Sequence, residues 1–223
     1  MKKPSTLFFD VNETLLDLSF LKEKITTALD DRGELVSLWF STLLHYSLVA
    51  NTIEAYKDFG EIGVAALQMV AAGNDITLTK QQAEAAVIKP FKKLKPYSEV
   101  RTSLLALREQ GFRLVALTNS SQKGLEEKLE FAGIADCFDT LLSCEPVQKF
   151  KPAPEVYNWA MTTMGVLPEN ALMIAAHGWD IAGAQNVGMQ TAFINRPGKQ
   201  QYPLVPEADY VVDDLSQLAS VIK

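Results

Sequence analysis

The residues of this chain that are best suited to chemistry stand directly after short, β-prone apolar runs. These residues are Asp10, Thr118, Asn119, His177 and Asp180. A carboxylate such as Asp10, with a lysine near enough to neutralise it, can stay ionised and attack an electrophilic carbon or phosphorus atom. The residue types therefore favour covalent catalysis by a carboxylate, provided that the fold brings them together.

The elements that must position these residues alternate between strand and helix. Apolar runs at 6–9, 113–117, 171–175, 191–194 and 210–212 predict strands, and helical patterns at 98–110, 123–131, 154–164 and 214–222 lie between or after them. Such alternation predicts an α/β, Rossmann-like parallel sheet with helices on both faces. Ligands of these sheets bind beyond the carboxyl ends of the strands. We therefore expect the polar residues to converge at one edge.

Residues 18–87 are helical in pattern throughout, with four predicted helices and no strand. This block predicts an inserted all-helical cap over residues 17–92, and residues 1–16 plus 93–223 then form the α/β catalytic core. Trp39, Phe40 and Tyr46 are expected in the core of the cap, with one of them available to line an apolar substrate pocket. His45 is expected to be a packed helix residue rather than a ligand.

Composition narrows the class of partner. The 223 residues carry a net charge of −6, which argues against nucleic acid as a partner but leaves room for a small anionic substrate. Cys137 and Cys144 are expected to be buried thiols, since two cysteines do not make a disulfide framework. No signal peptide or membrane-spanning run is apparent, so a cytoplasmic protein with no membrane partner is expected.

Four motifs follow one another in a familiar order. They are Asp10 with Thr14 four residues later, Thr118-Asn119 after a strand, Lys151-Pro152 before a helix, and residues 175–180 ending in Asp180. Together they span nearly the whole chain and resemble the haloacid dehalogenase superfamily. The resemblance implies that Asp10 is the nucleophile, that Thr14 and Thr118 orient a carboxylate, and that Asp180 holds Lys151. Lys151 could also stabilise the oxyanion formed when an ester is hydrolysed.

Two departures separate this chain from the phosphatases of that superfamily. Phosphatases carry a second Asp two residues after the nucleophile, where this chain has Asn12, and an acidic magnesium ligand where it has Ala176. Asn12 cannot protonate a leaving group, and Ala176 removes an oxygen ligand that Mg²⁺ would need. Because a halide leaves without a proton or a metal, dehalogenation is favoured.

The segment containing Trp179 and Asp180 is similar to the fourth motif of the L-2-haloacid dehalogenases. That resemblance implies hydrolysis of short 2-haloacids to 2-hydroxy acids through an aspartyl ester, with no metal or cofactor. It also implies a homodimer. The residues expected to bind substrate and halide are Val11, Asn12, Thr118, Asn119, Tyr157 and Trp179.

Two further positions depart from the common dehalogenase pattern. His177 and Glu13 replace an asparagine and a small residue, and a histidine ordered by a carboxylate is a good base near neutral pH. We therefore expect a Glu13–His177 dyad that activates the hydrolytic water. The arginine that dehalogenases place on the second cap helix is absent; alignment puts Ala50 about there, so either another cap residue substitutes or the preferred substrate differs.

Two alternatives remain open at this point. One is a Mg²⁺-dependent phosphatase acting on a small phosphoester, and the other is a binding protein that kept the fold without turnover. Halide release that persists in a chelator would favour the dehalogenase, and phosphate release that requires Mg²⁺ would favour the phosphatase.

Overall fold

A six-stranded parallel sheet forms the core of the computed structural model, which describes residues 2–222. The strands are β1 (Thr6–Phe9), β4 (Arg113–Thr118), β5 (Thr140–Ser143), β6 (Ala171–Ala175), β7 (Gln190–Ile194) and β8 (Tyr210–Val212). Their order is β5-β4-β1-β6-β7-β8, and every neighbouring pair is parallel. The predicted Rossmann-like core is confirmed, with β1, the strand that ends at Asp10, in its interior.

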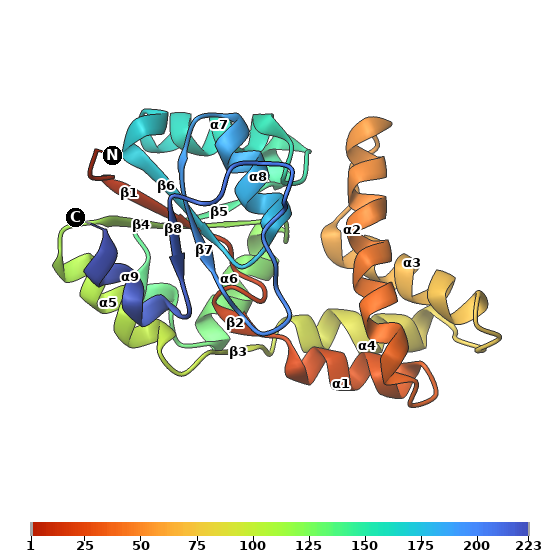
Figure 1. The fold of residues 1–223 in the computed structure, drawn as a ribbon. Helices are drawn as coiled ribbons and strands as arrows, with labels where there is room; N and C mark the ends of the chain where they lie inside the picture. The colour runs from red at the N-terminus through yellow and green to blue at the C-terminus, as the bar shows by residue number, and fades with distance from the viewer. Residues whose placement is uncertain (1, 223) are drawn as a thin grey trace.

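Alternate residues of β1 face two different hydrophobic layers. Leu7 and Phe9 pack with α5 (Val100–Glu109), α6 (Gln122–Phe131) and α9 (Leu215–Val221). Phe8 packs with α7 (Pro154–Met164) and α8 (Gly178–Asn186). This follows from the two-residue repeat of a strand, and the helices accordingly cover both faces of the sheet (Figure 1).

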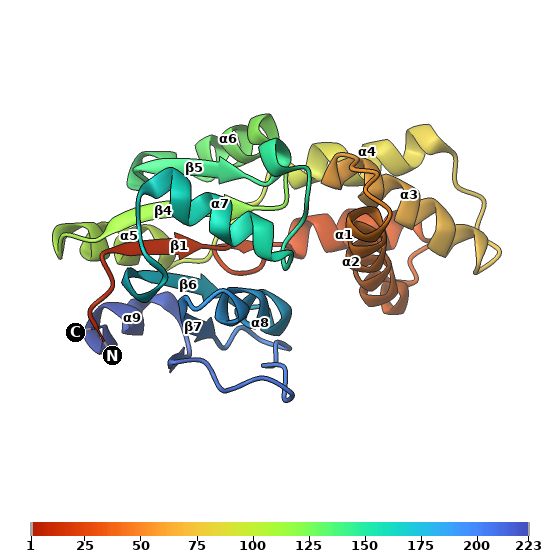
Figure 2. The same cartoon turned by 90° about the horizontal axis from the view of Figure 1, so that it is seen from above.

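The cap consists of four helices set beyond the carboxyl ends of the strands (Figure 2). They are α1 (Ser19–Ala28), α2 (Val36–Thr52), α3 (Phe59–Ala72) and α4 (Lys80–Phe91). Asp58 caps α3 by accepting from the Gly60 and Glu61 amides, and Thr79 forms a capping box with Gln82 at the start of α4. The antiparallel pair β2 (Leu16–Asp17) and β3 (Lys95–Pro96) connects cap and core.

Four short 3₁₀ turns complete the described structure: η1 (Gly33–Leu35), η2 (Ala135–Cys137), η3 (Glu145–Val147) and η4 (Pro168–Asn170). Both cysteines are buried free thiols, as expected. Within residues 2–222, no helix is both long enough and apolar enough to cross a membrane.

The cap differs from expectation in two details. Trp39 is buried and its Nε1 donates to the Gly63 carbonyl at 2.9 Å, but Tyr46 and His45 are exposed on α2, so their predicted packing was wrong. The buried stripe of α2 runs through Val36, Trp39 and Leu43. His45 lies on the opposite side of the helix, whereas Tyr46 lies beside the stripe and is 38% exposed at the hollow that it lines with Ala50.

Candidate active site

Asp10 lies at the carboxyl end of β1 with both oxygens of its carboxylate in use. Oδ1 accepts from Lys151 Nζ at 2.9 Å, and Oδ2 accepts from Thr14 Oγ1 at 2.7 Å and lies 3.0 Å from His177 Nδ1. Burial alone would raise the pKa of Asp10, but the Lys151 charge and the His177 hydrogen bond hold it far below its usual value. The carboxylate is therefore ionised and fixed in orientation.

Thr14 connects the loop after β1 to the loop after β6. Its hydroxyl donates to Asp10 and accepts from the Ala176 amide at 2.9 Å, and its carbonyl accepts from the Arg196 guanidinium at 2.9 Å. A threonine with both hydrogen-bonding roles filled sets the distance between the two loops. The predicted orienting role of Thr14 has the contact it requires.

Lys151 is fully buried beneath Asp10 and bridges two carboxylates. Its ammonium group donates to Asp180 Oδ2 at 2.6 Å and to the Leu117 carbonyl at 2.9 Å, in addition to Asp10. Burial would lower the pKa of Lys151, yet the two carboxylates outweigh it and raise the pKa well above its usual value. The ammonium thus stays charged, as a partner for a nucleophile requires.

Tyr157 lies behind Asp180 rather than beside Asp10. Its hydroxyl donates to Asp180 Oδ1 at 2.6 Å, and the ring is fully buried. A Cβ at Gly183 on α8 would lie 2.6 Å from this hydroxyl, so the close approach of α7 to α8 requires glycine there. Tyr157 therefore positions Asp180 and, through it, Lys151; the expected direct contact with substrate does not fit this placement.

Glu13 and His177 are in contact, as the predicted dyad requires. His177 Nε2 lies 3.1 Å from Glu13 Oε2, while Nδ1 faces Asp10. Glu13 adopts a left-handed backbone with φ of 61°, a conformation uncommon outside glycine that directs its side chain across to His177. Lys22 and Lys199 also bind the Glu13 carboxylate.

The protonation of His177 follows from these neighbours. Burial alone would lower the pKa of the imidazole, but hydrogen bonds to Asp10 and Glu13 outweigh it and raise the pKa above its usual value. Burial alone would raise the pKa of Glu13, but the hydrogen bond from His177 and the charge of Lys199 hold it far below its usual value. An imidazolium between two carboxylates donates from both nitrogens, so in the resting site His177 is an acid and not yet a base.

Two aromatic rings enclose His177. The Trp179 ring stacks on it with centroids 5.0 Å apart, and Phe40 of α2 stacks from the cap side at 6.3 Å. Phe40 is thus the α2 residue that reaches the site. The placement of Ala50 near the site was wrong: Ala50 lines a hollow between α2 and α3 together with Ile53 and Met69.

Four of the residues predicted to bind substrate are buried or hydrogen-bonded within the protein. The Asn119 side chain is occupied within the protein, because Oδ1 accepts from the Lys151 amide at 2.8 Å and Nδ2 donates to the Lys151 carbonyl at 3.4 Å. Thr118 Oγ1 accepts from the Ser120 amide at 3.3 Å. Val11 is fully buried, and Asn12 Oδ1 accepts from Lys128 Nζ at 2.9 Å.

Lys22, Lys128 and Lys199 are site neighbours that the sequence did not identify. Lys128 had a signal: Leu125, Lys128 and Leu129 follow the i, i+3, i+4 spacing of the buried face of α6, so a charged residue occupies a core position. Lys199 lies in a loop without periodicity, so no sequence pattern marked it as a site residue.

The residues at the site do not fit a magnesium ion of the kind that superfamily phosphatases bind. Ala176 offers no side-chain oxygen where the acidic ligand would stand, and the only side-chain oxygen of Asn12 accepts from Lys128. Over residues 2–222, no group of three or more His, Cys, Asp or Glu side chains is arranged to hold a metal ion. Lys151 supplies the positive charge between Asp10 and Asp180.

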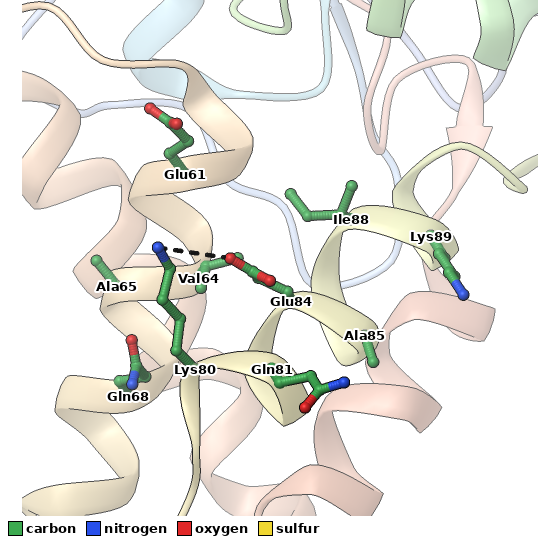
Figure 3. Close-up of a pocket in the computed structure, with 10 residues that line it drawn as sticks. All are labelled: Glu61, Val64, Ala65, Gln68, Lys80, Gln81, Glu84, Ala85, Ile88 and Lys89. Atoms are coloured by element: carbon green, nitrogen blue, oxygen red, sulfur yellow. Dashed lines mark ion pairs between the residues drawn. The ribbon is translucent and has the colours of Figure 1, made fainter.

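A separate hollow of about 640 Å³ lies between α3 and α4 on the cap (Figure 3). Its polar groups belong to the surface, and Lys80 pairs with Glu84 across 3.6 Å while both stay exposed. None of the predicted site residues lines it. The chemistry therefore belongs to the Asp10 site and not to this hollow.

Comparison with known proteins agrees with this geometry. Residues 4–188 match the family model described as haloacid dehalogenase-like hydrolase. The chain belongs to this family. Among curated haloacid dehalogenase-like hydrolases, the (S)-2-haloacid dehalogenase of Pseudomonas sp. strain YL is 29% identical over 216 residues, which cover 96% of this chain and 93% of that protein.

Solved haloacid dehalogenase-like structures share the fold along the whole chain. An L-2-haloacid dehalogenase crystal structure that is 28% identical superposes with a TM-score of 0.93 over 99% of both chains. The L-2-haloacid dehalogenase of Xanthobacter autotrophicus, solved with chloropropionic acid covalently bound, is 22% identical and superposes with a TM-score of 0.90 over 98% of both chains. Core and cap thus both follow the architecture of this family.

Proposed function

We propose that this protein hydrolyses short (S)-2-haloacids to 2-hydroxy acids through an ester on Asp10. One observation carries the proposal: an ionised, buried aspartate is held by Lys151 and Thr14, with a neutral amide, Asn12, where a phosphatase has its leaving-group acid. The similar Pseudomonas protein is an (S)-2-haloacid dehalogenase and the 28% identical structure is an L-2-haloacid dehalogenase, and both support the same substrate class.

The first step needs only the carboxylate of Asp10. One of its oxygens attacks the carbon that bears the halogen, the carbon–halogen bond breaks, and halide leaves with the bonding electron pair. Lys151 and Thr14 keep the carboxylate oriented, which lowers the entropy cost of reaching the transition state. In the resulting ester the Asp10 carboxyl group has lost its charge, the carboxylate of the substrate remains an anion, and no proton has moved.

Ester formation changes the protonation of His177. Because the imidazolium is held between two carboxylates, neutralising Asp10 removes one of the two anions that favour its charged form. The pKa of His177 then falls, and its proton passes to solvent. The ring nitrogen that faces Asp10 becomes a free base, while Glu13 still holds the other nitrogen.

The second step clears the ester. His177 takes a proton from water as the water oxygen attacks the carboxyl carbon of Asp10, and Lys151 stabilises the resulting oxyanion. Collapse breaks the bond between the Asp10 carboxyl carbon and the alkyl oxygen, which takes the second proton of the water and leaves as the 2-hydroxy acid. Asp10 returns as a carboxylate, and His177 keeps the first proton. The balance is one haloacid and one water giving one hydroxy acid, one halide and one proton, the proton released before hydrolysis.

The test is halide release from a small panel of 2-haloacids in the presence of EDTA, with Asp10→Asn as the control. We expect release by the wild type and none by the variant. A single turnover in heavy-oxygen water should place the label in the Asp10 carboxylate. Phosphate release that depends on added magnesium, without halide release, would overturn the proposal.

We also propose that the protein is a homodimer that associates through its cap. The hollow between α2 and α3 supports this, since it is lined by Val49, Ala50, Ile53, Ala66 and Met69, and Ile53 is 65% exposed. Light scattering of the wild type and of Ile53→Glu tests it. A monomeric wild type would contradict the proposal.

A further inference from the structure

Lys128 is a buried ammonium without an anionic partner. It is 2% exposed, its Nζ donates to Asn12 Oδ1 and to Ser120 Oγ, each at 2.9 Å, and it lies 5.0 Å from the centre of the Phe91 ring. No carboxylate within residues 2–222 forms an ion pair with it. A buried amine whose direct hydrogen-bond partners are all neutral is costly to charge, so an anion bound beside it would favour its charged form.

Each of the other cations around Asp10 has a carboxylate partner. Lys151 is shared by Asp10 and Asp180, and Lys22 and Lys199 both bind Glu13. Arg196 pairs with Glu99 at 2.6 Å, and Lys92 pairs with Glu127 at 2.6 Å. The helix α2 contains no lysine or arginine. Among these groups Lys128 is the one without a carboxylate partner within residues 2–222.

The partners of Lys128 add hydrogen-bond donors of their own. Asn12 and Ser120 both accept from the ammonium group, which leaves Asn12 Nδ2 and the Ser120 hydroxyl hydrogen free to donate elsewhere. Neither has an acceptor among the described side chains and backbone. Three hydrogen-bond donors therefore lie together. They come from Asn12 in the loop after β1, from Ser120 in the loop after β4 and from Lys128 of α6.

A small cavity opens beside two of these donors, Ser120 and Lys128. It has a volume of about 60 Å³, is lined on the core side by Ser120 and Lys128, and is closed on the cap side by Phe59 and Phe91. Asp58 also borders it, but its Oδ1 accepts from the backbone amides at the start of α3. The size suits a halide or one carboxylate group beside an apolar wall.

We propose that Lys128, Asn12 Nδ2 and the Ser120 hydroxyl form a subsite for one small monovalent anion. The identity of the anion rests on the proposed function: it is the substrate carboxylate or the released halide. The subsite supplies the positive charge that α2 lacks. Burial lowers the pKa of Lys128 to about 7, against the attraction of Asp10 and Asp58, and a bound anion would favour its charged form further.

Binding of two probes, propionate and chloride, to Lys128→Met tests the subsite without turnover. Methionine keeps the length of the side chain and removes the charge; Lys128→Arg keeps a charge, and Lys123→Met on the exposed face of α6 is the matched control. Saturation-transfer NMR reports propionate binding, and line broadening of the chloride resonance reports halide binding. Unfolding temperatures establish that each variant is folded.

Loss of propionate binding in Lys128→Met, with the KM for a 2-haloacid raised about tenfold or more, assigns the subsite to the carboxylate. Loss of chloride binding with propionate retained assigns it to the halide. Binding of both probes equal to that of Lys123→Met overturns the proposal. Failure of halide release by the wild type would instead overturn the proposed function and leave the binding result standing.

Discussion

His177 Nδ1 lies 3.0 Å from Asp10 Oδ2, so the imidazole contacts the carboxylate of the proposed nucleophile as well as Glu13. The contact makes the charge of Asp10 a determinant of the protonation of His177. While Asp10 is a carboxylate, His177 is held as an imidazolium; once Asp10 is an ester, one of its two anionic partners is gone. A single contact thus couples the completion of the first chemical step to the formation of the base for the second.

Asp10→Asn should lower the pKa of His177. The amide cannot supply the negative charge that now favours the imidazolium, so only Glu13 remains to do so. A proton NMR titration measures this directly. An unchanged His177 titration would remove the coupling between the two steps.

His177→Asn should separate the two halves of the reaction. Attack by Asp10 does not need the imidazole, so a stoichiometric burst of halide is expected, followed by turnover reduced about a hundredfold or more because general-base catalysis is lost. Intact-mass spectrometry should detect the ester on the protein. His45→Asn is the matched control and should turn over normally. Steady turnover at the wild-type rate in His177→Asn would exclude the dyad.

Sequence reasoning could place the groups that follow strands, because the parallel sheet itself brings the strand ends together. Asp10, Lys151, Asp180 and His177 converge as expected, and the Glu13 contact followed from two residues that differ from the common pattern. Helix boundaries were less accurate: the helical block was expected to end at residue 87, but its last helix, α4, continues through Pro90 to Phe91. Proline in the last turn interrupts only the few hydrogen bonds near the helix end.

Contacts made across the fold could not be predicted in the same way. Lys199 reaches Glu13 from a loop 186 positions away, and Phe40 reaches His177 only because the cap is set over the strand ends. No local pattern encodes such contacts. Lys128 is the intermediate case, since its position in the apolar stripe of α6 marks it as buried but does not name Asn12 as its partner.

The free energy of unfolding should fall steeply in acid. The pKa values of Asp10 and Glu13 are lowered by folding from 3.8 and 4.5, so their stabilisation is present above those values and is lost as the pH falls through the folded-state values. The raised pKa of His177 acts in the opposite direction: its contribution is complete below 6.5 and is lost as the pH rises through the folded value.

Urea denaturation across this pH range measures both effects. In Glu13→Gln the free energy of unfolding should fall less steeply in acid, because one of the two carboxylates responsible for the fall is gone. His177→Asn should remove the decrease in unfolding free energy that accompanies deprotonation of the imidazolium at higher pH. A wild-type acid limb that Glu13→Gln leaves unaltered would contradict the assigned contribution of Glu13.

Lys151→Met should be strongly destabilising. Removing the ammonium leaves the buried carboxylates of Asp10 and Asp180 side by side without a counter-charge, at a cost of about 3–5 kcal/mol of unfolding free energy. Adding Asp10→Asn to this variant should restore part of the loss, because one buried charge disappears. Both proteins are expected to be inactive, so denaturant unfolding is the measurement. Additive destabilisation in the double variant would show that the two residues do not interact.

Gly183→Ala should reduce activity from a position that touches no reacting atom. The new methyl group would lie 2.6 Å from the Tyr157 hydroxyl and from Pro152 Cβ, so Tyr157 must move away from Asp180. Overpacking of this kind costs about 1–3 kcal/mol, and the loosened Asp180 would hold Lys151 less firmly against the nucleophile. We expect kcat to fall more than KM rises, since positioning and not binding is affected.

Two further variants separate positioning from general damage at Gly183. Gly33→Ala is the matched control, because a methyl group there would meet only Thr26 atoms at 3.7 Å and should change neither stability nor rate. Tyr157→Phe removes the hydroxyl without crowding α8, so it should reproduce the loss of kcat with a smaller loss of stability. If Tyr157→Phe keeps full activity while Gly183→Ala loses it, the hydrogen bond from Tyr157 to Asp180 does not position Lys151.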